Sequence, residues 1–244
     1  MNLIRWLVTS RLWVALAAAA WCLESFDRMD TWVRWTLVAQ VFFLTWVAYL
    51  FLTDNAMRDQ RTWVLISLTG ACVTFQGFDT ILIPLACGAV VLGYRTHWMP
   101  ASWPLSRFSL RDIPILNNMI IAACWVLLCM VWPMYQNGES FNIDELSLLA
   151  AFLWITALSM MEDLFSESTP DASLRLIGKT GLRTIALLAI VFSFAINAYA
   201  AEIQFSVWLS LAATFFLVLL LPGGKRTPMK SWLIDAMILL RFPF

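Results

Sequence analysis

Long apolar runs alternate with short polar segments over the whole chain. A helix that crosses the hydrocarbon core of a bilayer needs about 20 residues, with roughly 17 as a usual lower limit. Several runs are shorter than this, so their ends are expected to extend into the neighbouring polar residues. The runs are Trp6–Leu23, Thr31–Leu52, Trp63–Phe78, Ile81–Tyr94, Ile115–Trp132, Leu146–Met161, Leu182–Ala201, Phe205–Leu221 and Ser231–Phe242. The pattern predicts nine transmembrane helices, the third and fourth separated at Gln76-Gly77-Phe78-Asp79.

The positions of the basic residues predict the topology. Lys and Arg accumulate in cytoplasmic loops of membrane proteins. With the N-terminus on the cytoplasmic side, all but three of the 16 Lys and Arg fall on that side, the exceptions being Arg28, Arg34 and Arg241. A wrong number of spans would disturb this alternation, so the charges support the nine-helix count.

Composition agrees with a membrane protein. Of 244 residues, 61% are hydrophobic and 13% are charged, whereas a soluble domain is about half apolar and about a quarter charged. The whole chain, 1–244, is expected to form one all-α transmembrane domain, and its short loops suit a bacterial inner membrane. The formal net charge is zero, which gives no reason to expect a nucleic-acid partner. His97 is the only histidine, which argues against a His-based metal centre or triad.

The chain also has a coarse internal symmetry. Helices one to four can be superimposed on helices five to eight, so that Leu52–Thr62 corresponds to Glu162–Gly181, each between the second and third helix of its half. Repeats of this kind place a central site at the repeat interface. We therefore expect two four-helix halves followed by a final helix.

The first corresponding segment reads LTDNAMRDQR at the end of the second run. If the helix continues, Asn55 and Asp59 lie four residues apart on one face, with Asp54 beside them. Carboxylate and amide oxygens are ligands that Mg²⁺ accepts when it also binds substrate phosphates, and Arg58 is placed to neutralise phosphate charge. The same residues also fit an ordinary solvated loop.

The second segment reads MEDLFSESTPD. Asp163 and Glu167 are spaced i, i+4, and Asp171 follows Pro170, which should end the helix. Lys179 and Arg183 lie downstream, within reach of a phosphate group. Taken alone, this segment also reads as a capped helix end.

The two segments together favour a site. Both lie on the basic side in equivalent positions, and ionisable groups beside membrane-buried cavities are usually functional. Two acidic helix ends facing one cavity would hold Mg²⁺ around a diphosphate and stabilise the charge of a departing diphosphate. Tyr94, Asn117 and Asn118 are candidate polar liners of the cytoplasmic mouth.

Six stretches, in this order, resemble the UbiA-type intramembrane prenyltransferase superfamily. They are RLWVALAAAAW, TWVAYLFLTDNAMRD, LRDIPILNNMIIAACW, ALSMMEDLFSESTPD, IGKTGLRTIALL and SWLIDAMILL. The second and fourth look like the two aspartate motifs of the family, and the third resembles its stretch before the fifth helix. The resemblance covers nearly the whole chain.

The resemblance implies a nine-helix bundle with a lateral opening to lipid. Family members use Mg²⁺ to transfer a polyprenyl group from its diphosphate to an aromatic or other lipid-soluble acceptor. It assigns the first motif to Asp54, Asn55 and Asp59, the second to Asp163 and Asp171, and diphosphate contacts to Arg111, Lys179 and Arg183. The chain departs from the pattern at Ser166, where a carboxylate is expected and Glu167 is the substitute, and at Asn117, where Lys is frequent.

Three functions follow as hypotheses. The first is an Mg²⁺-dependent prenyltransferase with catalytic Asp54, Asp59, Asp163 and Asp171. In it the substrate-binding residues are Asn55, Arg58, Tyr94, Arg111, Asn117, Glu167, Lys179 and Arg183, and the metal ligands are Asp54, Asn55, Asp59, Asp163, Glu167 and Asp171. The second is a non-catalytic relative that binds an isoprenoid lipid or scaffolds a membrane complex. The third is a small transporter, for which no charged or broken helix pair near the midplane is seen.

Overall fold

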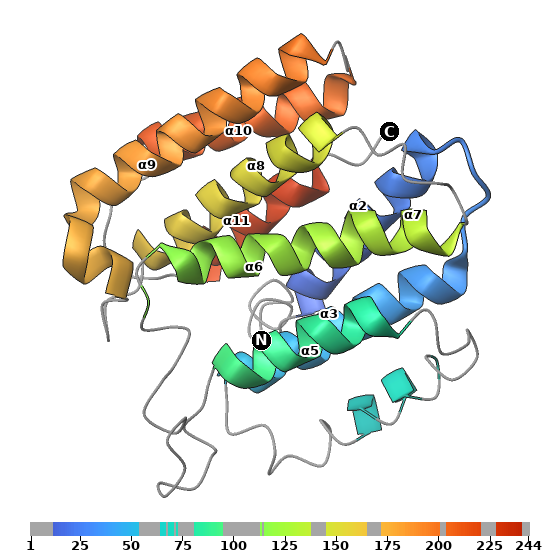
Figure 1. The fold of residues 1–244 in the computed structure, drawn as a ribbon. Coiled ribbons are helices and arrows are strands. Elements are labelled where there is room, and N and C mark those ends of the chain that lie inside the picture. The colour runs from blue at the N-terminus through green and yellow to red at the C-terminus, as the bar shows by residue number, and fades with distance from the viewer. Residues whose placement is uncertain are drawn as a thin grey trace, which may run out of the picture. The chain divides into compact units, whose positions relative to one another are not determined.

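The computed structural model describes residues 12–53, 64–66, 68–70, 72, 81–94, 113, 115–137, 145–164, 172–200, 204–220 and 228–240. Within these ranges all regular structure is helical and no strand occurs (Figure 1). The helices are α2 (Leu12–Arg28), α3 (Trp35–Thr53), α5 (Leu82–Tyr94), α6 (Leu116–Val126), η6 (Leu127–Val131), α7 (Trp132–Gln136), α8 (Glu145–Leu164), α9 (Ala172–Tyr199), α10 (Phe205–Leu220) and α11 (Pro228–Leu239).

The described part of every predicted apolar run contains helix, which confirms the all-α class. The described helices Leu116–Gln136, Glu145–Leu164 and Arg175–Tyr199, of 21, 20 and 25 residues, are long and apolar enough to cross a membrane. Several helices extend beyond the apolar run that predicted them. α2 continues past Leu23 to Arg28, and α8 includes Asp163.

The chain divides into two compact units, and the division passes through one continuous helix. Residues 1–107 and 127–141 form the first unit, and residues 108–126 and 142–244 form the second. α6 therefore belongs to the second unit, while η6 and α7, which follow it without a break, belong to the first.

In the first unit, α2 packs on α3, η6 and α7. Its Ala15, Ala17 and Ala18 are fully buried, and small residues let helix backbones approach closely in membrane proteins. α2 ends in a Schellman motif, in which Thr31 N–H donates to Phe26 O at 3.2 Å and Asp30 N–H donates to Asp27 O at 3.0 Å. Asp30 adopts the left-handed conformation, with φ 49°, that this motif requires.

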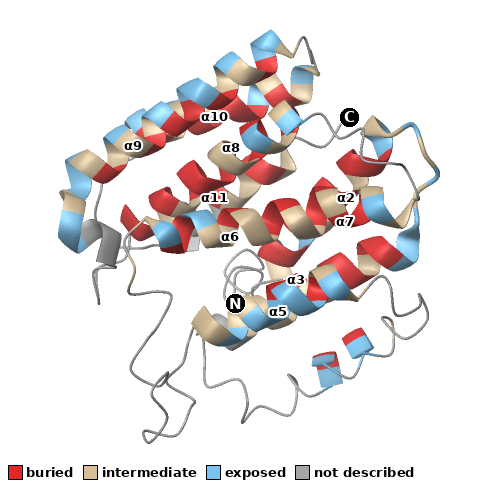
Figure 2. Ribbon diagram, in the orientation of Figure 1, coloured by how far each residue is buried: buried red, intermediate tan, exposed pale blue. Residues whose placement is uncertain are grey.

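In the second unit, α8 is the central helix. It contacts α6, α9, α10 and α11, and Figure 2 shows buried positions along most of its length. Ser193 Oγ of α9 donates to Ala150 O at 2.8 Å. Trp154 Nε1 donates to Thr214 Oγ1 of α10 at 3.0 Å. These bonds fix how α9 and α10 are aligned along α8.

The outer faces of the second unit are strongly apolar. Phe192 and Val191 of α9 are 58% and 50% exposed, and Phe216 of α10 is 57% exposed. A water-facing surface rarely carries large contiguous apolar patches. This surface has the character of helix faces that contact lipid.

Candidate functional site

The predicted site is only partly within the described residues. Asp54, Asn55, Arg58, Asp59, Arg111, Glu167 and Asp171 lie outside them. Tyr94, Asn117, Asp163, Lys179 and Arg183 are described. Tyr94 is the last residue of α5 in the first unit, and the other four belong to the second unit.

Asp163 is the terminal acceptor of a hydrogen-bond chain between α6 and α8, with Asn118 at its centre. Asn118 Nδ2 donates to Asp163 Oδ2 at 2.9 Å. Ser159 Oγ donates to Asn118 Oδ1 at 2.6 Å. Ser159 and Asp163 share one face of α8 because they are four residues apart, so the Asn118 amide bridges both of them. The two bonds together determine which amide atom of Asn118 is the oxygen.

This chain of bonds is in a nearly dry environment. Asn118 is fully buried and Asp163 is only 8% exposed. Burying a carboxylate is costly unless it is hydrogen-bonded or paired. The Asn118 amide supplies one such bond, so the position of Asp163 depends on a residue 45 positions earlier in the chain.

The turn that leads into α6 is strained. Ile115 has φ 63°, a value at which a β-branched residue is a genuine outlier. Asn117 N–H donates to Ile113 O at 3.2 Å, and Met119 N–H donates to Ile115 O at 3.1 Å. Strain of this kind costs roughly 1–3 kcal/mol and concentrates at binding and catalytic sites. Here it lies two residues before Asn117, the first of two adjacent asparagines.

Asn117 supplies a second oxygen at the same end of α6. Its side chain is 2% exposed, and its Oδ1 has no hydrogen-bond partner. An amide oxygen and a carboxylate are hard donors of the type that Mg²⁺ accepts, so these residues fit that ion chemically. Within the described ranges no three His, Cys, Asp or Glu side chains gather as metal ligands, and the further predicted ligands lie outside those ranges.

Lys179 and Arg183 lie at the same end of the second unit as Asp163. α8 and α9 run antiparallel (Figure 1), and their alignment is set by the bond between Ser193 and Ala150. The number of residues from Ala150 to Asp163 on α8 equals the number from Thr180 to Ser193 on α9. Because both helices rise equally per residue, Asp163 is level with Thr180. Lys179 is exposed and Arg183 half-buried.

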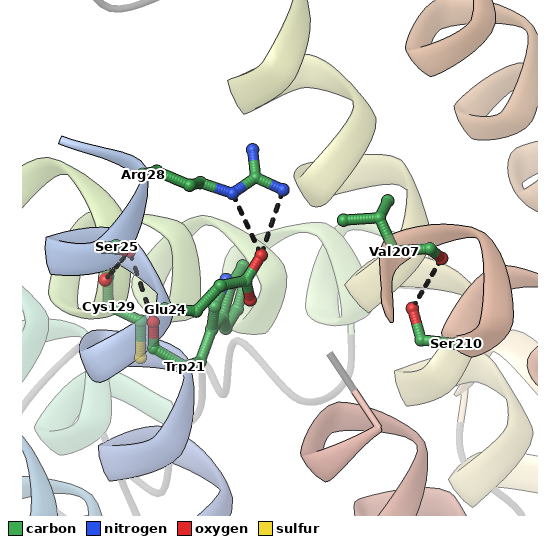
Figure 3. A network of polar contacts seen from close by, with 7 residues as sticks. All are labelled: Trp21, Glu24, Ser25, Arg28, Cys129, Val207 and Ser210. Atoms are coloured by element: carbon green, nitrogen blue, oxygen red, sulfur yellow. Dashed lines mark hydrogen bonds and ion pairs between the residues drawn. The ribbon is translucent and has the colours of Figure 1, made fainter. Parts of the chain in front are cut away.

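The first unit contains buried polar residues just beyond the end of the predicted apolar run Trp6–Leu23. Glu24 is fully buried and forms an ion pair with Arg28, from Oε1 to Nη2, at 2.9 Å (Figure 3). At the next residue, Ser25 Oγ lies 2.7 Å from Cys129 O and 3.2 Å from Trp21 O. The burial of Glu24 was not predicted, because the apolar run was taken to end at Leu23. The i, i+4 spacing of Glu24 and Arg28 is the one sequence signal of their ion pair.

The bond from Ser25 to Cys129 has a clear cause. Pro133 lacks the N–H that would donate to the carbonyl four residues earlier, and its ring clashes with that carbonyl. That carbonyl belongs to Cys129, in the π-helical turn η6. In transmembrane helices, serine side chains and local π geometry commonly satisfy groups freed by proline. In the second unit Ser210 Oγ bonds within its own helix, to Val207 O at 2.8 Å (Figure 3).

Comparison of the chain with family models, curated proteins and solved structures gives no match.

Proposed function

We propose that the chain is a UbiA-like membrane prenyltransferase. It transfers an isoprenyl group from its diphosphate to an aromatic or other lipid-soluble acceptor. The proposal includes a nine-helix bundle of two four-helix halves and a final helix, in a bacterial inner membrane, with the N-terminus in the cytoplasm. The three long apolar helices and the apolar outer faces of α9 and α10 support the membrane location.

One observation carries the proposal. The bond from Asn118 to Asp163 joins LRDIPILNNM, which resembles the stretch before the fifth helix of the family, to MMEDLF, which resembles its second aspartate motif. Neither segment is specific alone. Their contact at one buried helix end, beside the strained Ile115 and level with Lys179, is the arrangement expected of a diphosphate-binding end.

The proposed reaction breaks the C1–O bond of an allylic diphosphate. The diphosphate leaves with the bonding electron pair, the acceptor forms the new carbon bond, and the acceptor loses a proton. Bound Mg²⁺ would supply neutralisation of the charge that accumulates on the departing diphosphate. In this chain Asp163 would be among its ligands, and Asn118 and Ser159 hold Asp163 in position. Lys179 and Arg183 are proposed as cationic contacts of the diphosphate.

A second candidate is a non-catalytic relative that binds an isoprenoid lipid. The nearly complete burial of Asp163 and its hydrogen bond to Asn118 favour this candidate, because a carboxylate held in this way also serves packing alone. Asn117, in place of a frequent lysine, removes one cation. Binding without turnover distinguishes this candidate from the enzyme.

The test is Mg²⁺-dependent binding of farnesyl and geranylgeranyl diphosphate to the purified protein. Asp163→Asn should weaken binding about 10- to 100-fold, as is usual for loss of a ligand or of its supporting shell. Asp27→Asn, at an exposed carboxylate of α2, is the matched control and should bind like the unmodified protein. Undiminished binding by Asp163→Asn would remove the proposed site. Prenyl transfer to a panel of phenolic acceptors then separates the two candidates.

A further inference from the structure

α9 is broken near its beginning by a conformation that only glycine adopts readily. Gly178 has φ 74° and ψ 169°, a region that is essentially restricted to glycine. The short piece before Gly178 is not collinear with the long helix that follows it. Figure 1 shows this bend at the N-terminal end of α9. We call residues Arg175–Lys179, which span this break, the basic elbow.

The basic elbow carries charge without compensation from its own helix. α9 contains Arg175, Lys179 and Arg183 and no acidic residue. Arg175 and Lys179 are exposed, and neither forms an ion pair with another described residue. Two cations on either side of one backbone break are therefore available to an anion.

The elbow also exposes a large apolar side chain between the two cations. Leu176 is 72% exposed. The helix that starts here, Arg175–Tyr199, is one of those long and apolar enough to cross a membrane. The continuous helix after the Gly178 break, residues 179–199, extends about 31 Å at 1.5 Å per residue, so its basic end reaches the edge of a hydrocarbon core about 30 Å thick. A free phosphate ion makes no apolar contact with Leu176, whereas the acyl chains of a phospholipid do.

We infer that the basic elbow binds the phosphate headgroup of an anionic phospholipid at the membrane surface. Arg175 and Lys179 contact the phosphate, Leu176 inserts beside the acyl chains, and the Gly178 bend directs the two cations to one headgroup. The inference rests on the proposed membrane location and not on prenyl transfer. Lys179 is also proposed above as a diphosphate contact, and the experiment separates these two sources of phosphate.

The experiment measures lipid retention by native mass spectrometry of the full-length purified protein. Phosphatidylglycerol and phosphatidylcholine with identical acyl chains are supplied in equal amounts. The unmodified protein should retain an excess of phosphatidylglycerol. Because a cation near an anionic surface changes binding by about five-fold, Lys179→Gln should reduce the excess about five-fold. Arg175→Gln with Lys179→Gln should reduce it on the order of 20-fold.

Two control variants make the result specific. Arg34→Gln removes an exposed cation of the first unit and should leave the excess unchanged. Arg175→Lys with Lys179→Arg keeps both charges and should retain the excess. If the doubly neutralised variant fails to fold, Lys179→Gln alone decides the question.

Three results would overturn the inference. These are an unchanged excess in the neutralised variants, an equal loss in Arg34→Gln, and displacement of the lipid by millimolar inorganic diphosphate, which would assign the elbow to a soluble phosphate compound. Prenyl diphosphate binding by Asp163→Asn is measured separately, so failure here does not imply failure of the proposed function. Failure of that binding test would likewise leave the lipid site standing.

Discussion

The hydrogen bond between Ser25 and Cys129 links two helices of the first unit and supports a quantitative prediction. Ser25→Ala removes the hydroxyl that lies 2.7 Å from Cys129 O. Cys129 is 1% exposed, so water has little access to its carbonyl. Pro133, four residues on, has no N–H to replace the lost donor. The substitution therefore leaves a buried carbonyl without this donor.

The expected cost is about 1–2 kcal/mol. A buried polar group left unsatisfied costs roughly 1–3 kcal/mol, but side-chain hydrogen bonds measured in a membrane protein average about 0.6 and reach about 1.7 kcal/mol. The short distance and the absence of the proline N–H place this bond towards the upper part of that range.

A double-mutant cycle with Pro133→Ala tests the reasoning. Alanine at position 133 restores an N–H that the helix can direct to Cys129 O. In this background Ser25→Ala should cost only about 0.5 kcal/mol, which gives an interaction free energy of about 1 kcal/mol. Reversible unfolding of the four proteins in mixed detergent and dodecyl sulfate micelles measures these free energies. Equal costs of Ser25→Ala in both backgrounds would refute the assignment of proline as the cause.

Two further predictions concern local structure. Asp30→Gly should stabilise the protein by about 0.5–1 kcal/mol in the same unfolding assay, because glycine adopts the left-handed conformation at φ 49° without a Cβ penalty; destabilisation would mean that the exposed Asp30 side chain contributes a contact. Asn118→Leu removes the donor to Asp163 at 2.9 Å and should destabilise by about 2 kcal/mol, whereas Ser159→Ala, which leaves that donor in place, should cost about 1 kcal/mol. Equal effects of these two substitutions would argue against Asp163 as the group that needs the bond.

Much of the fold was predictable because a long apolar run is a signal carried by a single helix. A run such as Leu146–Met161 favours a helix, since a helix pairs its backbone N–H and C=O groups internally and a membrane span requires this. The helix ends were less predictable. The predicted apolar runs ended at Leu23 and Met161. Glu24 and Asp163, just beyond them, lie inside helices and are buried, because a partner on the same or another helix offsets the cost of burying the charge.

The residues of the candidate site were likewise only partly predictable from the sequence. Asp163 was predicted from the spacing of acidic residues, but the residue that holds it was not. The sequence resemblance singled out Asn117, because it stands where the resembled superfamily frequently has Lys. The structure shows that Asn118 makes the bond to Asp163. Two adjacent asparagines on a helix point about 100° apart, and only the packing of α6 on α8 decides which one faces the carboxylate.

By itself, the sequence determined that the chain is helical, where its apolar segments lie, and which segments carry acidic and basic groups. These are local properties, set by backbone hydrogen bonding and by the transfer of side chains from water to an apolar phase. Tertiary structure alone decided that Ser25 satisfies the carbonyl freed by Pro133, that Asn118 and not Asn117 bonds Asp163, and that Gly178 separates Arg175 from Lys179. These hydrogen-bond partners and this helix break depend on which helix faces pack together and on individual backbone angles. An apolar pattern does not encode either of them.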